Sequence, residues 1–359
     1  MNTQMTDNSP KIKRETKNKI KVDFERTSFW TRFRLKFLTG NALWKGILWV
    51  FRLILLLGIS YVILQPFITK IASSVMSRED FVDVTVKLIA KHPTLDTYKA
   101  IIVDNKYFTA LMNTAILSIS CALIQTMICS LIGYGFAKYK FKGSKILFFL
   151  VILTMIVPHS TLQLSLYMKF KYFDIGIGKY GLFSLLGGGI SENIKLLGFS
   201  SLDLTNAFWP LLLLSLGGLG FKNGLFIFMM RQFFRGVPDE LEESAYIDGY
   251  GPMKTFFKII IPISIPMMIT VFLFAFSWQW TDEFYSKLFF PSSNGPALLP
   301  TIIKIPKSLS QELDYAGKTL YTTAINNTCG LLVLFPLIIV YLFCQRYLVQ
   351  GIERSGIVG

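Results

Sequence analysis

The sequence predicts an all-α membrane protein with six transmembrane helices and both termini in the cytoplasm. Of its 359 residues, 52% are hydrophobic and only 16% are charged, whereas about a quarter of the residues of a soluble domain are charged. The hydrophobic residues lie in long runs with almost no charge, and about 20 such residues in a helix cross a bilayer. Alternate loops between these runs are rich in lysine and arginine, as cytoplasmic loops of membrane proteins are.

Six apolar runs predict the six helices. Residues 46–65 contain one charge, Arg52, and residues 204–230 contain one, Lys222. The other four runs are free of charge: 108–137, 146–168, 259–281 and 319–345. Backbone N–H and C=O groups find no water inside a bilayer, so such runs form helices. Four glycines interrupt the fourth run, which is therefore the least regular: Gly217, Gly218, Gly220 and Gly224.

Basic residues set the orientation. Residues 1–43 are a predicted basic cytoplasmic arm, which suits either a helix on an anionic membrane surface or a flexible tail. The first transmembrane helix is expected at 44–65, and an extracellular segment at 66–107. A core at 108–348 follows, with a cytoplasmic loop at 232–260, and a cytoplasmic tail closes the chain at 349–359. The lysine-rich loop 138–145 falls inside, and segments 169–203 and 282–318 fall outside.

Charge and cysteine usage exclude several classes of protein. In a soluble protein, a net charge of +15 would indicate binding to nucleic acid. The sequence contains no compact basic domain of that kind, so the expected partner of these charges is membrane lipid. The four cysteines all lie in predicted spans. We therefore expect them to be small core residues, and we expect neither a disulfide framework nor a metal site.

The loop ahead of the fifth span is predicted to be a helix, a turn and a second helix. Pro238 suits a first helical turn, and the acidic residues after it complement the helix dipole. Gly249 stands where a left-handed C-terminal cap is expected, and Pro252 restarts a helix. Taken alone, this pattern also fits an ordinary amphipathic loop at a membrane surface. The acidic residues are Asp239, Glu240, Glu242 and Glu243.

This loop resembles the EAA motif of ABC importer permeases, which reads Glu-Ala-Ala, three residues, Gly, nine residues, Ile-x-Leu-Pro. The matching positions are Glu243, Ser244 and Ala245, then Asp248 and Gly249, and finally residues 259–262 ending in Pro262. Ser244 and Ile261 depart mildly from the motif. The flanking residues 231–234 and Pro238, and the tail 346–359, are similar to the carbohydrate (MalG-type) branch. The resemblance covers about residues 90–359 and implies a MetI-like permease core.

The resemblance also implies a mechanism and partners. The motif residues would form a coupling helix that sits in a groove of a separate ATPase, and the permease itself would be non-catalytic. The chain contains no Gly-x-x-x-x-Gly-Lys-Ser/Thr sequence, so it is expected to bind no cofactor, with ATP and Mg²⁺ at the partner ATPase. The implied partners are a second, homologous permease subunit, two ATPase subunits and an extracellular solute-binding protein that delivers a sugar or oligosaccharide.

Polar residues at membrane depth are candidates for the translocation path, because they tend to face a bundle interior or a wet cavity. Lys222 is the main one, although it could also extend toward water at a helix break. For the uncharged polar candidates, hydrogen bonding between helices is the favoured role. For the tryptophans, anchoring at the membrane interface is favoured, and stacking on a sugar is the alternative. The candidates are Lys222, Asn223, His159, Gln163, Trp278 and Trp280.

Three competing classes remain. A membrane-embedded enzyme would need a catalytic group of residues at membrane depth, and with only two histidines and no acid pair in a span none is evident. An ion-coupled secondary transporter would carry carboxylates in its spans, and the predicted spans contain no Asp or Glu. A permease of the same superfamily for an amino acid, peptide or ion is disfavoured by the carbohydrate-like flanking residues.

Overall fold

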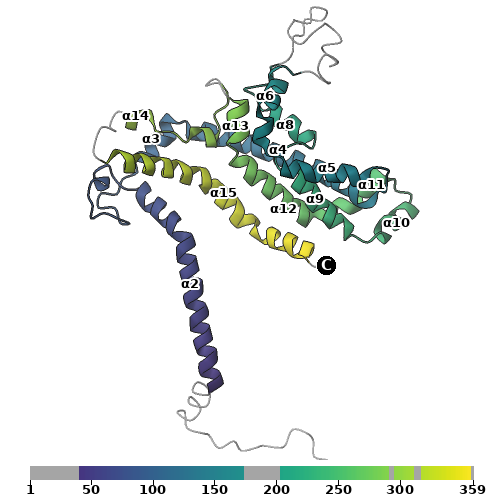
Figure 1. The fold of residues 1–359 in the computed structure, drawn as a ribbon, viewed down its shortest axis with the longest axis horizontal. Helices are drawn as coiled ribbons and strands as arrows, with labels where there is room; N and C mark the ends of the chain where they lie inside the picture. Colours follow the sequence, from purple (N-terminus) through teal and green to yellow (C-terminus); the bar gives the residue numbers. More distant parts are fainter. Residues whose placement is uncertain (1–39, 174–202, 291–294, 311–316, 357–359) are drawn as a thin grey trace, which may run out of the picture. The chain divides into compact units, whose positions relative to one another are not determined.

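The computed structural model describes residues 40–173, 203–290, 295–310 and 317–356. Every regular element within these residues is a helix, which confirms the all-α class (Figure 1). The chain divides into two units, Met1–Pro66 and Phe67–Gly359. The predicted basic arm 1–43 lies almost entirely outside the described residues, and so does most of the predicted external segment 169–203.

In the first unit the described residues belong to helix α2 (Gly40–Ser74), which continues beyond the unit boundary. The helix extends past the predicted end at residue 65, because the residues after it remain largely apolar and Pro66 is accommodated within it. Its apolar side chains cover all sides of the helix rather than one stripe. A helix that is apolar all round is suited to lipid.

Four helices among the described residues are long and apolar enough to cross a membrane. They are α2, α4 (Tyr107–Lys138), the continuous helix Pro252–Trp280 and α15 (Lys318–Gly356). These match the first, second, fifth and sixth predicted spans. α15 continues through most of the predicted tail 349–359.

The third predicted span is a bent pair of helices. α5 (Ser144–Ile156) is followed by the 3₁₀ turn η2 (His159–Leu162) and α6 (Gln163–Lys171), and the pair bends by 97°. Pro158 explains the break, since the residue before a proline is driven out of the helical region, and Val157 is extended, with ψ 120. Counted as one span, the pair raises the number of candidate spans to five.

The fourth predicted span is two short helices, α8 (Trp209–Leu216) and α9 (Asn223–Arg235). The connection between them contains Gly218 with φ +71 and Lys222 with φ +63. Left-handed residues cannot continue a right-handed helix. The glycine-rich interruption noted in the sequence therefore breaks the run, and neither half reaches spanning length by itself.

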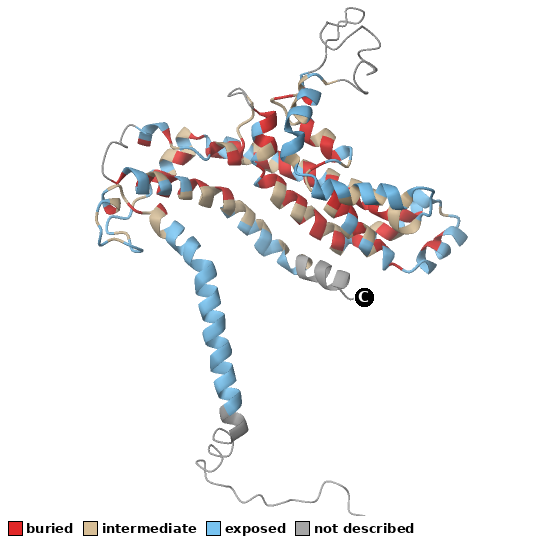
Figure 2. Cartoon of the chain, in the orientation of Figure 1, coloured by how far each residue is buried: buried red, intermediate tan, exposed pale blue. Residues whose placement is uncertain are grey.

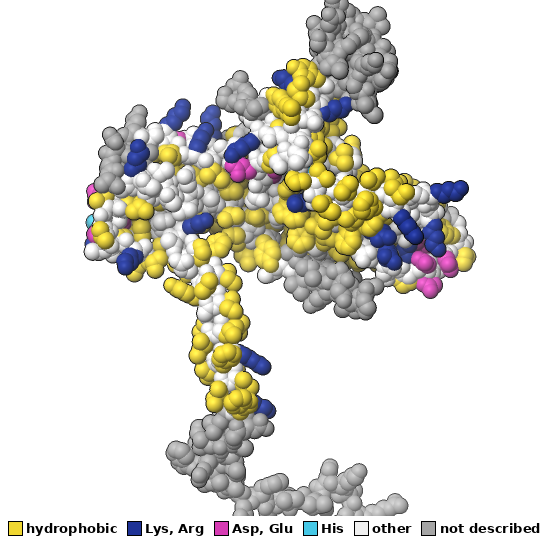
Figure 3. Space-filling view, viewed as in Figure 1, with side chains coloured by type: hydrophobic (Ala, Val, Ile, Leu, Met, Phe, Trp, Pro, Cys, Tyr) yellow, Lys and Arg dark blue, Asp and Glu magenta, His cyan; other side chains and the backbone are white. Residues whose placement is uncertain are grey.

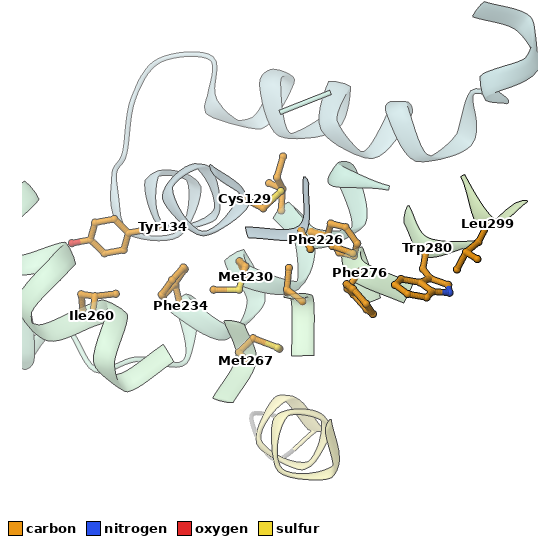
Figure 4. Close-up of a cluster of buried hydrophobic side chains, with 14 of the residues drawn as sticks. Cys129, Tyr134, Phe226, Met230, Phe234, Ile260, Met267, Phe276, Trp280 and Leu299 are labelled. Carbon is orange, nitrogen blue, oxygen red and sulfur yellow. The ribbon is translucent and has the colours of Figure 1, made fainter. Parts of the chain in front are cut away.

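The core of the second unit lies between α4, α9 and α12 (Ile261–Trp280), and α15 packs on α12. Figure 4 shows a string of buried side chains from these helices, from Tyr134 and Ile260 at one end to Trp280 and Leu299 at the other. Burial is concentrated along this seam, while the outer surface of α5 is exposed (Figure 2). Exposed apolar helix faces of this kind are suited to lipid or to partner helices.

Short helices cover the end of the unit away from the loop that contains the EAA-like motif. They are η1 (Glu79–Phe81), α3 (Asp96–Asp104), α13 (Phe284–Phe289), η5 (Leu299–Ile302) and α14 (Lys307–Ser310). Side-chain to backbone hydrogen bonds hold this end together and tie it to α4, where Thr114 Oγ1 accepts the Leu299 N–H at 2.9 Å. Asn105 Nδ2 donates to the carbonyls of Ile302 and Lys304, at 3.0 and 2.9 Å.

Candidate functional site

The EAA-like loop folds as a short helix closed by a glycine. α10 (Glu240–Ile247) has Asp239 at its N-cap and three acidic residues in its first turn. Gly249 follows with φ +79, and its N–H donates to Tyr246 O at 3.0 Å while the Tyr250 N–H donates to Ala245 O at 2.9 Å. This pair of bonds is the Schellman arrangement that ends helices in a left-handed residue. The predicted left-handed cap at Gly249 is confirmed.

The two faces of α10 differ sharply. Ala245 is only 1% exposed, so its small side chain permits close packing within the chain itself. Ile247 is 86% exposed, and Leu241 and Tyr246 on the same helix are also exposed. The remaining predicted coupling residues, Glu243, Ser244, Asp248 and Gly249, all lie on the exposed side. α10 therefore offers apolar side chains beside acidic ones on one outward face, which suits docking to a protein cleft.

A buried ion pair holds α10 against the end of α4. Lys138 Nζ lies 2.5 Å from Asp239 Oδ1 and 3.5 Å from Glu242 Oε1, and it donates to Val237 O at 2.5 Å. Tyr134 donates its hydroxyl to Glu242 Oε2 at 3.1 Å. Glu242 and the Lys138 side chain are almost wholly buried, a setting in which losing one partner leaves a costly unpaired charge.

The motif alone did not identify these anchoring residues. Lys138 follows a charge-free run, and a lysine at that place is ordinarily interpreted as the boundary of a span. Glu242 is one of four acidic residues within 239–243, and the sequence does not distinguish it from the other three. Only the fold brings the end of α4 next to α10. The Lys138 ammonium also holds the pKa of the exposed Asp239 carboxyl below its usual value, through a hydrogen bond and its charge.

The second half of the loop enters the following span through an unusual turn. α11 (Pro252–Thr255) leads into the π-helical turn η4 (Phe256–Ile260), and Pro262 stands directly after this turn as the second residue of α12. Phe256 and Ile260 point into the core, whereas Met253 and Phe257 are exposed. The predicted apolar stripe is therefore divided between two surfaces. π-helical turns are rare and often lie at functional sites.

This end of the second unit is basic. In Figure 3, Lys and Arg side chains gather around the acidic tip formed by α10. Exposed cations from the α4–α5 connection, α9 and the α11–η4 segment surround it: Lys140, Lys142, Lys145, Arg235, Lys254 and Lys258. Such clustering is typical of the cytoplasmic side of a membrane protein.

A second candidate site is a cavity of about 540 Å³ in the same unit. It lies where α5, η2 and α6, the α8–α9 connection, α12 and α13 meet. Four of the six residues predicted for a translocation path line it: His159, Lys222, Asn223 and Trp278. The fold thus brings together residues that are up to 119 positions apart in the chain, from 159 to 278.

Polar groups in the cavity stand among aromatic rings. Lys222 Nζ lies 5.6 Å from the centre of the Trp278 ring and 5.2 Å from that of Phe221. His159 Nδ1 is 2.9 Å from the Tyr285 hydroxyl, so these two groups share a hydrogen bond. Tyr285 was not predicted, because it lies beyond the fifth span and only the turn after Trp280 carries it back to the cavity.

The other two predicted path residues lie elsewhere. Gln163 begins α6 and is exposed, and it is not among the cavity-lining residues. Trp280 is buried in the core, where its indole N–H donates to Val333 O at 2.9 Å. That contact ties α12 to α15 and gives Trp280 a packing role in this unit. Gln125 of α4 is buried as well, and its side-chain N–H donates to Ser215 Oγ of α8 at 3.1 Å.

Comparison with protein families places the chain clearly. Residues 129–354 match the model of the binding-protein-dependent transport system inner membrane component. The chain is 24% identical over 309 residues to the polygalacturonan/rhamnogalacturonan transport system permease protein YtcP of Bacillus subtilis (strain 168), which covers 85% of this chain and 96% of that protein. It is 25% identical over 271 residues to the maltodextrin transport system permease protein MdxG of the same organism, covering 74% and 81%.

A solved structure shares the fold. The crystal structure of a bacterial ABC transporter involved in the import of the acidic polysaccharide alginate aligns with a TM-score of 0.63 at 18% identity, covering 84% of this chain and 96% of that one. At this level of identity the likeness concerns the fold. It agrees with the MetI-like core expected from the EAA-like motif.

Proposed function

The chain belongs to the family of inner membrane components of binding-protein-dependent transport systems, and from this premise we propose that it is the permease subunit of an ATP-driven importer of a saccharide. The relatives named above are permeases for polygalacturonan or rhamnogalacturonan and for maltodextrin. A further relative, 25% identical over 279 residues, is the galactooligosaccharides permease GanQ. These names support a sugar or oligosaccharide as the cargo of this chain.

The observation that carries the proposal is the glycine-closed helix α10, presented at the basic end of the unit. Its exposed side chains Leu241, Tyr246 and Ile247 form the contact surface for a separate ATPase. Its inward side, with Ala245 and Glu242, is fastened to α4. A helix fixed on one face and free on the other can pass the movement of a docked partner to the bundle as a rigid-body change.

The proposed membrane arrangement has six spans and cytoplasmic termini. Four of the spans are the long helices, the third span is the bent pair α5–α6, and the fourth span is the broken pair α8–α9. Non-helical backbone at membrane depth is tolerated where it is buried in protein or lines a cavity. The α8–α9 connection meets this condition, because Gly218, Gly220 and Lys222 line the cavity.

In this arrangement the cavity belongs to the translocation path. In Figure 4 the buried side chains of one core extend from Tyr134, which bonds Glu242 beneath α10, to Trp280, two residues beyond the cavity-lining Trp278. Closure of two ATPase subunits on ATP would move α10, and the core would carry that movement to the cavity. A second permease subunit completes the path, and an extracellular solute-binding protein delivers the cargo. ATP and Mg²⁺ belong to the ATPases.

Crosslinking tests the coupling role. Ile247→Cys places a reactive thiol on the exposed face of α10; Cys121, Cys129 and Cys329 are buried and less reactive, and the partly exposed Cys344 is replaced by Ser in every crosslinking variant. In the assembled transporter, a bifunctional maleimide should join this thiol to the ATPase subunit. Ile303→Cys, also exposed but at the other end of the unit, is the matched control and should give no such product. An intact complex in which Ile247→Cys captures no nucleotide-hydrolysing subunit contradicts the proposal.

A further inference from the structure

We propose that the cavity selects an acidic saccharide, one that carries a carboxylate, and that Lys222 is the residue that recognises this charge. The inference rests on the proposed function and narrows it from saccharides in general to uronate-containing ones. Four features of the cavity carry it: an unpaired cation, an unsatisfied amide, a wall of aromatic rings and a strained backbone that fixes the cation in place.

Lys222 has no acidic partner among the described residues. The ion pairs found there involve other lysines, and the cavity-lining residues include no Asp or Glu. The contacts of its ammonium are with the Phe221 and Trp278 rings. A charge in an apolar cavity is expensive unless an opposite charge or hydrogen-bond acceptors meet it. An anionic group of the cargo would supply that partner.

Asn223 offers the complementary chemistry for hydroxyl groups. Asn223 is 2% exposed and lines the cavity, and neither its Oδ1 nor its Nδ2 atom has a hydrogen-bond partner. Most buried polar side-chain atoms are hydrogen-bonded, so two unsatisfied atoms on one amide call for a partner. A sugar hydroxyl both donates and accepts, which matches the two ends of an amide group.

The aromatic wall favours a ring-shaped ligand. Trp278 and Tyr285 line the cavity together with His159, and the Phe221 ring contacts all three of them. Aromatic faces provide broad apolar contact with a polar edge, which suits the apolar face of a sugar ring. The cavity volume of about 540 Å³ falls in the range of small-molecule sites.

The position of the cation is set by backbone strain. Lys222 has φ +63 and ψ +14 directly before Asn223, the first residue of α9. A left-handed backbone is unfavourable for lysine, and residues held this way cluster at functional sites. The N-terminal end of α9, a helix of 13 residues, adds the partial positive charge that favours anions. The charge of Lys222 and the partial positive charge at the N-terminal end of α9 therefore both favour an anion at this point of the cavity.

The test uses the complete transporter, with its partner permease and ATPases, in nanodiscs without the binding protein. The probes are radiolabelled trigalacturonate, trimannuronate and triglucuronate, each with its fully methyl-esterified form, and maltotriose as a neutral oligosaccharide. Lys222→Asn removes the charge with a residue that tolerates the left-handed backbone, and Lys222→Arg keeps the charge. Lys287→Asn, an exposed lysine on α13, controls for loss of a cation elsewhere.

We expect at least one acidic trisaccharide to bind wild type about ten-fold or more tightly than its methyl ester. Lys222→Asn should lose that difference, while Lys222→Arg and Lys287→Asn should keep it. Equal binding of acidic and esterified forms overturns the inference, and so does an acid preference that survives in Lys222→Asn. Loss of copurifying phosphatidylglycerol from Lys222→Asn, with saccharide binding unchanged, would assign the cation to a lipid headgroup and also overturn it.

A parallel uptake assay separates this inference from the function it rests on. Proteoliposomes containing the transporter and its binding protein are tested with the same acidic and neutral oligosaccharides. ATP-driven uptake of maltotriose that is at least as fast as uptake of every acidic trisaccharide would leave the permease function standing and remove the acidic specificity. Absence of ATP-driven uptake of every saccharide, with the complex assembled, would overturn both.

Discussion

Gly249 is a residue whose conformation alone explains its identity. It has φ +79, and a Cβ atom added to it would meet no atom within 4 Å, so the space around it would admit any small side chain. What excludes other residues is the left-handed backbone that closes α10. Such a site separates conformational strain from steric clash.

Gly249→Ala is therefore expected to weaken the closure of α10 by about 1 kcal/mol. Substrate-stimulated ATPase activity of the assembled complex should fall about five-fold, the factor that corresponds to this energy. Gly249→Asn, in which the side chain tolerates the left-handed region, should fall much less. Equal losses in the two variants would show that the backbone conformation is not what matters there.

Asp282 is a buried acid whose environment predicts a pH dependence. It lies beyond the spanning helix Pro252–Trp280 and accepts the N–H groups of Tyr285 and Ser286, at 3.3 and 3.1 Å. Burial nevertheless raises the pKa of its carboxyl from 3.8 to about 6. The folded protein thus binds this proton more tightly than the unfolded chain does, so the contribution of Asp282 to stability improves as pH falls through about 6 towards 4.

Asp282→Asn should consequently stabilise the protein at pH 8, by on the order of 1–3 kcal/mol. The amide carries no charge to desolvate, and its one oxygen replaces only one of the two carboxylate oxygens that accept the N–H groups of Tyr285 and Ser286, so the lost hydrogen bond offsets part of the gain. The gain should shrink as the pH falls through 6 and vanish below about pH 3, where the wild-type carboxyl is protonated in both states. Thermal unfolding in detergent across this pH range measures it, and a pH-independent difference would contradict the explanation.

At the scale of the elements, close helix contacts depend on particular glycines. A Cβ atom on Gly133 of α4 would lie 2.8 Å from Met230 Cβ and 3.0 Å from the Arg231 backbone N of α9. On Gly224 of α9 it would lie 2.6 Å from Thr154 Oγ1 of α5. Small residues that let helix backbones approach are the usual device of membrane helix packing. Two glycines therefore determine how closely α9 packs on its two neighbours.

Gly133→Ala should destabilise the α4–α9 contact by about 1–3 kcal/mol, since the neighbouring backbone has little room to move. Gly135→Ala is a matched control on the same helix, because a Cβ there meets nothing within 4 Å and alanine is the better helix former. The two variants should differ in thermal stability in detergent, with Gly135→Ala at or above wild type. Similar losses in both would rule out the steric explanation.

For the whole molecule, the main feature is that the two candidate sites lie on one packed core. α10 is fastened to the end of α4 by Lys138 and Glu242, and the cavity is bounded by α9 and α12, which pack on the same helix. A movement of α10 can reach the cavity through the rigidity of this core alone, because tightly packed helices move as a unit.

The proposed orientation makes a prediction for the whole chain. In intact cells, a membrane-impermeant maleimide should label Ile303→Cys and leave Ile247→Cys unlabelled, and permeabilised cells should show both. The wild-type chain, whose Cys344 is partly exposed, gives the background. Labelling of Ile247→Cys from outside would reverse the topology and remove the proposed contact with a cytoplasmic ATPase.

The sequence by itself determined the features that depend on local pattern. Apolar runs with at most one charge identified the four long helices, because spanning length and hydrophobicity are properties of a continuous segment. The motif around Gly249 identified the short capped helix, since capping depends on a few neighbouring residues. It also pointed to Lys222 and Trp278 as polar and aromatic residues in unusual positions.

Only the tertiary structure decided which of these residues meet. The bend after Ile156 and the break ahead of Asn223 follow from Pro158 and from left-handed residues, but their consequence, a cavity shared by His159, Lys222 and Trp278, depends on helices packed from distant parts of the chain. The same holds for the inward position of Ala245 and for the burial of Glu242 by Tyr134 and Lys138. Hydrophobic periodicity specifies which face of a helix is buried, whereas the identity of its neighbour is set by shape and charge across the whole fold.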